Sequence, residues 1–464
     1  MSDAEALLDR AVAARVLARA LANGGEFAEV FAERRDGMTM AVDESRIESV
    51  QSGVEEGAGV RVQSGGTTYF AHVDGLDPAD LERAATEAAA ALRGERAEPH
   101  ALRARATAPL PIERQPEEVP AERKAEMLRE LDEWGRAEGG EIAQLRASYG
   151  EARRQVAIAN SDGLLTGDDR TRVRIGVQAV ARREGRVETG AETLGGHRGF
   201  ELLEDDPGAI AASAARKALT LLEAGPAPAG SMPVVVGGGF GGVLFHEMTG
   251  HGLEADHVQK DASVYAGKLG AQVARPLLSA FDDGRMPGEW GSDGIDDEGV
   301  ATQKTQVIAD GRLTSFLYDR VTADRDGAAS TGNGRRESFR HLPIPRMTNT
   351  YIAPGDASPE AMIGEVEKGF YAVSFGGGQV DPATGDFVFG VSEGYLIEGG
   401  TVTAPCRGAM LIGNCLDALA AIDAVGDDFW MKTGICGKGG QKVPVGTGQG
   451  HVRIAAMTVG GTEV

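Results

Sequence analysis

A short stretch rich in proline and glycine divides the chain into two halves with different patterns of apolar residues. It reads Ala-Gly-Pro-Ala-Pro-Ala-Gly-Ser at residues 224–231. Proline and glycine interrupt both helices and strands, so such a stretch is a natural boundary. The chain has 464 residues, which is more than one hydrophobic core usually supports. We therefore expect an N-terminal domain over residues 1–225 and a C-terminal domain over residues 226–464.

The N-terminal half alternates between helical and strand-like patterns. Asp77-Pro78 is a typical helix start, a capping side chain followed by proline in the first turn. Residues 94–120 are rich in Pro, Arg and Glu and read as a linker or an exposed loop, at the break between two successive α/β units. This mixed order favours an α+β fold, with helices packed on mixed or antiparallel sheets, over a parallel βαβ array. Helices are expected over 3–22, 77–93, 121–134 and 207–223, and strands over 38–73 and 143–190.

The C-terminal half reads as mainly β. Ala309-Asp310-Gly311 and Glu398-Gly399-Gly400 each join two alternating segments, as hairpin turns do. Near its start, a short apolar strand over 232–236 leads into the glycine-rich run 237–242. That run lacks the Lys-Ser/Thr of a P-loop, so it is better read as a tight turn before a helix.

Charge and cysteine content exclude several classes of protein. The net charge of −23 disfavours binding to nucleic acids and to anionic membranes. Three cysteines in this length argue against a disulfide framework and for a reducing compartment. No apolar run approaches the roughly 20 residues of a membrane span, and the N-terminus lacks the pattern of a signal peptide. We expect a cytoplasmic protein with no nucleic-acid partner and no membrane partner.

The segment His246-Glu247-Met248-Thr249-Gly250-His251 carries the clearest chemical signal. It holds two of only 8 histidines in the chain, and they frame a glutamate. Neutral imidazole is the commonest side-chain metal ligand. A glutamate beside a metal-bound water is the usual general base of metal hydrolases. The pattern indicates His246 and His251 as metal ligands and Glu247 as a catalytic base.

The spacing of the two histidines demands a distorted helix. Residues five apart lie about 140° apart around a regular α-helix, so both rings could not face one ion. Gly250 and Gly252 would permit local unwinding, and a π-bulge would also bring the rings together. On spacing alone, the alternative is that both rings are hydrogen-bonded core residues.

Two imidazoles do not complete a catalytic metal site, which normally has three protein ligands and a water. His257 and Glu254 lie close in the sequence, and three cysteines lie downstream. The chemistry of the residues does not choose among them. Glu254 and Asp256 are further candidates for orienting the imidazoles by hydrogen bonds, and the alternative is that they are solvated charges at a helix end.

Two other charged segments lie in the C-terminal half. Arg335 and Arg336 are candidates for binding a substrate carboxylate or carbonyl. The alternative, and the commoner case, is that they form structural ion pairs. The acidic segment Asp293–Glu298 does not match the calcium-loop pattern and reads as a turn.

Five blocks of sequence, taken together, resemble the TldD side of the TldD/PmbA metallopeptidase family. The first is GVLFHEMTGHGLEADH, which contains the histidine motif. The later ones follow in the family's order: GIDDEG (294–299), TGNGRRES with PRMTNTY (331–351), FGGGQVD (375–381) and CGKGGQKVPVGTGQ (436–449). The PmbA side of the family lacks the histidine motif, so the match is to the TldD side.

The resemblance implies a function and completes the site. It makes residues 226–464 a metallopeptidase domain, with Cys436 as the third ligand to one divalent metal per chain, for which zinc is favoured. It implies hydrolysis of unfolded or flexible peptides, such as leader peptides and short-lived small proteins. It also implies a homodimer or a heterodimer with a PmbA-type relative. The alternatives are a biosynthetic metalloenzyme acting on a modified peptide or an amide-bearing small molecule, and a non-catalytic partner subunit.

Overall fold

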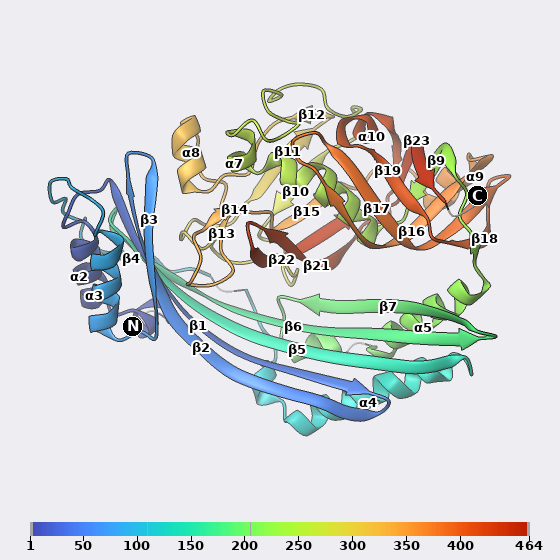
Figure 1. The fold of residues 1–464 in the computed structure, drawn as a ribbon, viewed down its shortest axis with the longest axis horizontal. Helices are drawn as coiled ribbons and strands as arrows, with labels where there is room; N and C mark the ends of the chain where they lie inside the picture. Colours follow the sequence, from blue (N-terminus) through green and yellow to red (C-terminus); the bar gives the residue numbers. More distant parts are fainter. Residues whose placement is uncertain (1–2, 109, 205, 462–464) are drawn as a thin grey trace.

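The computed structural model describes residues 3–108, 110–204 and 206–461, and it has two main layers (Figure 1). One layer is a long, strongly curved sheet built from the N-terminal half. The C-terminal half, which is rich in short strands, packs over one face of that sheet, and helices cover the other face. The expected α+β fold with a mainly β C-terminal region is confirmed.

The N-terminal sheet has seven strands in the order β3-β2-β1-β5-β6-β4, with β7 paired to β6. Its long central strands are antiparallel, and β1 pairs with β5 to join the two predicted α/β units into one sheet. The division of the chain at residue 225 stays a prediction. The strands are β1 (Phe27–Asp43), β2 (Arg46–Ser64), β3 (Thr67–Asp74), β4 (Arg103–Ala104), β5 (Ile142–Asn160), β6 (Leu164–Arg183) and β7 (Arg186–Gly196).

Two groups of helices pack on the outer face of this sheet and form separate cores. Helices α2 (Arg10–Ala20) and α3 (Pro78–Ala88) share a core with one end of β1, β2 and β5. Helices α4 (Ala121–Ala137) and α5 (Gly208–Glu223) cover the other end of β1, β5 and β6. Asp77 caps α3 as expected, since its side chain accepts a hydrogen bond from the Ala79 amide at 2.9 Å. The helices are α1 (Asp3–Leu7), α2 (Arg10–Ala20), α3 (Pro78–Ala88), η1 (Pro116–Glu118), α4 (Ala121–Ala137), η2 (Phe200–Leu203) and α5 (Gly208–Glu223).

An eight-stranded sheet and a six-stranded sheet form most of the C-terminal half, together with a two-stranded pair. The large sheet contains β8 (Gly225–Pro226), β9 (Gly230–Val236), β16 (Lys368–Val380), β17 (Asp386–Glu398), β18 (Thr401–Arg407), β19 (Met410–Asn414), β20 (Ile422–Val425) and β23 (Val452–Gly460). The six-stranded sheet contains β10 (Ala280–Asp283), β11 (Lys304–Ala309), β12 (Arg312–Leu313), β15 (Asn349–Ile352), β21 (Trp430–Lys438) and β22 (Gln441–Gln449). The two-stranded pair is β13 (Gly334–Arg335) with β14 (Ile344–Pro345). The α-helices of this half that follow the histidine motif are α7 (Ala255–Val258), α8 (Arg320–Asp326), α9 (Pro359–Gly364) and α10 (Cys415–Ala421).

Both predicted hairpin turns are present in this half. Asp310 and Gly311, between β11 and β12, have φ of 46° and 76°. Gly399 and Gly400, between β17 and β18, have φ of 54° and 72°. Positive φ at both central residues is the signature of the type I′ turn that matches the twist of a hairpin.

A buried network of ion pairs joins the two layers. Arg61, Arg170 and Arg172, on strands of the long sheet, reach Glu298, Asp297 and Asp293, each with a 2.6 Å hydrogen bond. The acidic segment 293–298 is therefore the turn that fastens the C-terminal half to the sheet. Among the described residues, no helix is long and apolar enough to cross a membrane.

Candidate metal centre

The histidine motif lies on a helix whose winding changes at the first histidine. The α-helix α6 (Gly242–Phe245) continues into one π-helical turn, η4 (His246–Gly250), and then into a short 3₁₀ turn, η5 (His251–Leu253). A π-helical turn bonds residues five apart, so His246 and His251 return to the same face. The distortion expected from the spacing is confirmed, and it takes the π-helical form.

Glycine lets this helix lie directly on its neighbours. A Cβ atom on Gly242 would lie 2.5 Å from the backbone nitrogen of Gly448 in β22. A Cβ atom on Gly250 would lie 1.9 Å from Sδ of the buried Met347. The backbone of Gly448 cannot yield, so glycine at position 242 lets the motif lie against the six-stranded sheet. At position 250 a larger residue would force the Met347 side chain to move.

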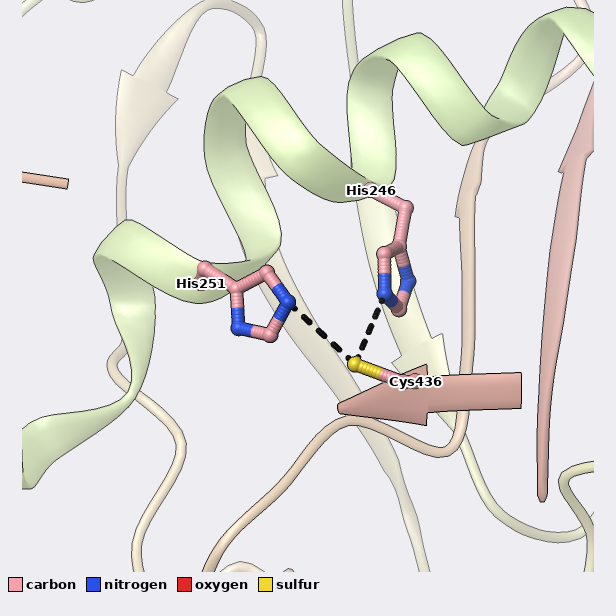
Figure 2. Close-up of side chains that lie close together, drawn as sticks. All are labelled: His246, His251 and Cys436. Carbon is pink, nitrogen blue, oxygen red and sulfur yellow. Dashed lines mark hydrogen bonds between the residues drawn. The ribbon is translucent and has the colours of Figure 1, made fainter. Parts of the chain in front are cut away.

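The two imidazoles converge on a cysteine from a distant part of the sequence (Figure 2). Sγ of Cys436, on β21, lies 3.3 Å from Nε2 of His246 and 3.2 Å from Nε2 of His251. The three side chains are buried, with exposed fractions of 3%, 8% and 4% for His246, His251 and Cys436. The residue chemistry had left several alternatives for the third position. Cys436, which the family resemblance indicated, is the one that lies beside both imidazoles.

The neighbouring charges favour the thiolate form of Cys436. Burial alone would raise the pKa of the thiol, but the imidazoles of His246 and His251 outweigh burial and lower it to about 5. The thiolate is the form of cysteine that binds metals. The cluster therefore holds Cys436 in the form that a metal would bind.

A buried carboxylate orients His251. Oε2 of Glu254 lies 3.0 Å from Nδ1 of His251, and because a carboxylate only accepts, Nδ1 carries the proton. The other ring nitrogen, Nε2, is the one that faces Cys436. Burial would raise the pKa of Glu254, but Lys438 and His251 outweigh burial and lower it to about 2. Of the two alternatives for Glu254, the orienting contact is the one that the structure contains.

Two cations beside Glu254 were not identified from the sequence. Nζ of Lys438 lies 3.2 Å from Oε2 of Glu254 and 2.5 Å from Oδ1 of Asp256. Arg346 lies on the other side, with Nε 3.7 Å from Oε1. Lys438 follows Cys436 by two residues on a strand, so the two side chains share a face. That spacing could have identified Lys438 as a neighbour of the cluster from the sequence. Asp256 reaches the cluster only through Lys438.

Glu247 and His257 lie at the edge of the cluster. Oε2 of Glu247 is 3.7 Å from Nε2 of His251, and its side chain is 25% exposed. It is the most accessible side chain of the π-helical turn, which suits a group that meets substrate. His257 is partly buried, and its Nδ1 lies 3.2 Å from the backbone oxygen of His251. It takes no part in the cluster.

The remaining candidates are engaged elsewhere. Nη2 of Arg336 donates to Glu29 at 2.7 Å, and Nη1 of Arg335 donates to the Met347 carbonyl at 2.6 Å. Both arginines are buried, so their surroundings match the ion-pair alternative rather than a substrate clamp. Cys406 and Cys415 are buried and lie outside the His/Cys cluster.

The donor set fits a divalent transition metal. The three ligand atoms lie within 4.8 Å of one another, and no other such group occurs among the residues that the structure describes. Tetrahedral nitrogen and sulfur ligands of one zinc ion lie about 3.5 Å apart, close to the observed 3.2 and 3.3 Å. Two imidazoles and a thiolate leave one coordination position open, as catalytic sites require.

Comparison with family models covers most of the chain. The PmbA/TldA metallopeptidase models match as domain 1 over residues 28–92, as central domain over 114–222 and as C-terminal domain over 229–461. The chain belongs to this metallopeptidase family. A metalloprotease TldD homolog of Haemophilus influenzae is 40% identical over 94% of this chain and 93% of its own length. A metalloprotease of Methanothermobacter thermautotrophicus is 34% identical over 94% of this chain and 96% of its own length.

Solved structures share the fold of the PmbA/TldA family. A protein of Thermotoga maritima described as a putative modulator of a DNA gyrase superposes with a TM-score of 0.78, 22% identity and coverage of 94% of this chain and 96% of its own. TldE from Thermococcus kodakarensis superposes with a TM-score of 0.76 and 20% identity, and the match covers 94% of this chain and 97% of its own. At this identity the likeness concerns the architecture alone. The relatives named as metalloproteases imply a metal, and the His/His/Cys cluster is where this chain offers ligands.

Proposed function

We propose that the protein is a metal-dependent peptidase, with one metal held by His246, His251 and Cys436 and with Glu247 as general base. The observation that carries this proposal is the convergence of three buried ligand atoms within 4.8 Å of one another beside a partly exposed glutamate. Metalloprotease relatives aligned over nearly the full chain support the same activity.

The roles of the side chains follow from their positions. When bound, a divalent metal would supply a Lewis acid that lowers the pKa of water and polarises a peptide carbonyl. Glu247 would take a proton from the attacking water and return it to the leaving amine. Glu254 would keep His251 in the tautomer that presents Nε2.

Zinc is the ion that we propose for the site. Cysteine thiolate and histidine are its usual ligands, and it accepts four-coordinate geometry readily. A thiolate ligand donates more charge than a third histidine would, so a metal bound here would be a weaker Lewis acid than in a three-histidine site. Activation of the attacking water would then depend more on proton removal by Glu247.

Unfolded or flexible peptides, such as leader peptides and short-lived small proteins, are the proposed substrates. β21, which carries Cys436, is the terminal strand of its sheet, and in the described part of the chain no strand pairs with its other edge. An extended peptide added there would form main-chain hydrogen bonds with little demand on sequence. The backbone of a flexible chain is free to form these bonds, whereas most of the backbone of a folded protein is already paired.

The proposed setting is the cytoplasm, and the proposed assembly is a homodimer or a heterodimer with a PmbA-type relative. The family resemblance is the ground for this assembly, and the structure of TldE from Thermococcus kodakarensis shares the fold of this chain. A non-catalytic partner subunit would have no need for the His/His/Cys cluster with Glu247. A biosynthetic metalloenzyme acting on a modified peptide would use the same site. The two functions are distinguished by whether the protein cleaves an unmodified, unstructured peptide.

Glu247→Gln tests the proposed chemistry. The amide keeps the size of the side chain but accepts no proton, so the variant should bind metal as the wild type does and lose peptide cleavage. Cleavage of an unstructured peptide is followed beside metal content for both proteins. Retained cleavage with full metal content would remove Glu247 from the role of base.

A further inference from the structure

One buried arginine contacts both segments that supply the His/His/Cys cluster. Nη2 of Arg346 donates to the backbone oxygen of Cys436 at 2.7 Å, and Nη1 donates to that of Gln441 at 3.2 Å. Its Nε atom lies 3.7 Å from Oε1 of Glu254, the carboxylate that orients His251. Arg346 is 0% exposed. One guanidinium therefore spans the cysteine-bearing hairpin and the end of the histidine-bearing helix.

The backbone of Arg346 is itself fixed. Its amide donates to the backbone oxygen of Asn333 at 2.9 Å. Its carbonyl accepts from the side-chain amide of the same asparagine, also at 2.9 Å. Asn333 in turn donates to the buried Asp282 at 2.7 Å. With both ends held, the guanidinium has little freedom to move away from the cluster.

The contact with Glu254 is electrostatic and incomplete as a hydrogen bond. In the described part of the chain, neither Nε of Arg346 nor Oε1 of Glu254 has a hydrogen-bond partner. The two atoms are buried and face each other at 3.7 Å. Arg346 and Lys438 therefore flank this buried carboxylate, at 3.7 Å from Oε1 and 3.2 Å from Oε2, and fix its position between them.

We propose that Arg346 is a positioning residue that sets the spacing between Cys436 and His251. The proposal rests on the function proposed above, that these residues bind a metal. Arg346 holds the β21–β22 hairpin by two carbonyls and holds the carboxylate that aims His251. Its planar fork serves both tasks at once, which the single ammonium of lysine cannot do. Removing it should loosen the ligand set without removing a ligand.

Arg172 offers a matched control in the same chain. It is also a buried arginine that donates to two backbone oxygens, those of Trp290 at 2.9 Å and Ser292 at 2.8 Å. It also pairs with one carboxylate, Asp293, to which it donates at 2.6 Å. These contacts join the long sheet to the C-terminal half and touch none of the three ligands. Replacing either arginine costs stability, but only Arg346 should change the metal site.

The experiment compares metal binding by the wild type, Arg346→Met, Arg346→Lys and Arg172→Met. Zinc affinity is measured by competition with a chelator, and Co²⁺ is used as a spectroscopic probe of the thiolate–metal bond. Arg346→Met should lower zinc affinity by about ten- to a hundred-fold, as loss of groups that orient ligands does. It should also weaken or shift the thiolate-to-cobalt absorption, and Arg346→Lys should fall between. Arg172→Met should bind both ions as the wild type does.

Each outcome decides one claim. Wild-type affinity and spectrum in both Arg346 variants would overturn the positioning role while leaving the proposed function standing. An equal loss in Arg172→Met would show a general effect of stability and would also overturn it. No metal binding by the wild type would overturn the proposed function itself. If Arg346→Met does not fold, Arg346→Lys against Arg172→Lys decides by the same criteria.

Discussion

Nδ1 of His251 lies 3.0 Å from Oε2 of Glu254, three residues further along the chain. The contact spans the point where the 3₁₀ turn η5 ends and the chain becomes extended, since Glu254 has φ −68° and ψ 118°. Which ring nitrogen a histidine offers to a metal is set by the hydrogen bond of the other. In this chain the carboxylate determines that His251 presents Nε2 to Cys436.

Glu254→Gln should weaken metal binding while leaving all three ligands in place. The amide is neutral, and it leaves Lys438 without its carboxylate partner at this position. Zinc affinity should fall about ten- to a hundred-fold, measured by chelator competition. Asp256→Asn is the matched control, because Asp256 contacts the same Lys438 but not His251. Equal affinities for the two variants would contradict the orienting role.

Gly242→Ala should displace the start of the motif helix from β22. The added Cβ would lie 2.5 Å from a backbone nitrogen of Gly448, and a backbone has no flexible end that can yield. We expect a loss of about 1–3 kcal/mol in the free energy of unfolding, read from urea denaturation, together with weaker zinc binding. At Gly364, in α9, a Cβ would meet nothing within 4 Å. Gly364→Ala should lower neither quantity, since alanine is the better helix former, and a similar loss there would refute the packing argument.

Glu192 should contribute to stability at neutral pH and lose that contribution in acid. Burial would raise its pKa, but Lys217 and Lys432 outweigh burial and lower it from the ordinary 4.5 to about 2. The contribution, about 3 kcal/mol at most, is present above about pH 4.5 and is lost as the pH falls toward 2. Glu192→Gln should therefore be less stable than the wild type near pH 7, and the difference should narrow as the pH falls from about 5 to about 3. A difference independent of pH, in urea unfolding, would exclude the ion pairs as its source.

This glutamate also links the helices of the first half to the strand that carries Cys436. Lys217 lies on α5 at 2.8 Å from Glu192, and Lys432 lies on β21 at 2.9 Å. Loss of the link should therefore affect global stability more than metal affinity. A zinc affinity of Glu192→Gln close to that of the wild type would fit this assignment.

Local features of the fold were predictable because their causes are local. Asp77 caps a helix through its own side chain, and Gly311 and Gly400 take the positive φ that their hairpins need. A distortion of the motif helix also follows from spacing, since two rings five residues apart do not share a face of a regular α-helix. The spacing left local unwinding at glycine and a π-bulge open, and the structure contains the π-helical turn. These features depend on a few neighbouring residues, which the sequence displays directly.

Partners from distant parts of the chain were not predictable in the same way. Arg346 meets Cys436 across 90 residues, and Arg61 meets Glu298 across 237. Which charges pair across such separations depends on how the sheets pack, and no periodic pattern encodes it. Cys436 itself was fixed as a candidate by the family resemblance, while the residue chemistry left several alternatives.

Metal content per chain of the purified protein, measured for the wild type beside Cys436→Ala and His251→Ala, tests the central claim most directly. Cys415→Ala serves as the control, because Cys415 is buried outside the cluster. We predict about one zinc per chain in the wild type and in the control, and loss of stoichiometric zinc in the other two. A wild type that holds no stoichiometric metal after zinc is supplied would contradict the metallopeptidase assignment.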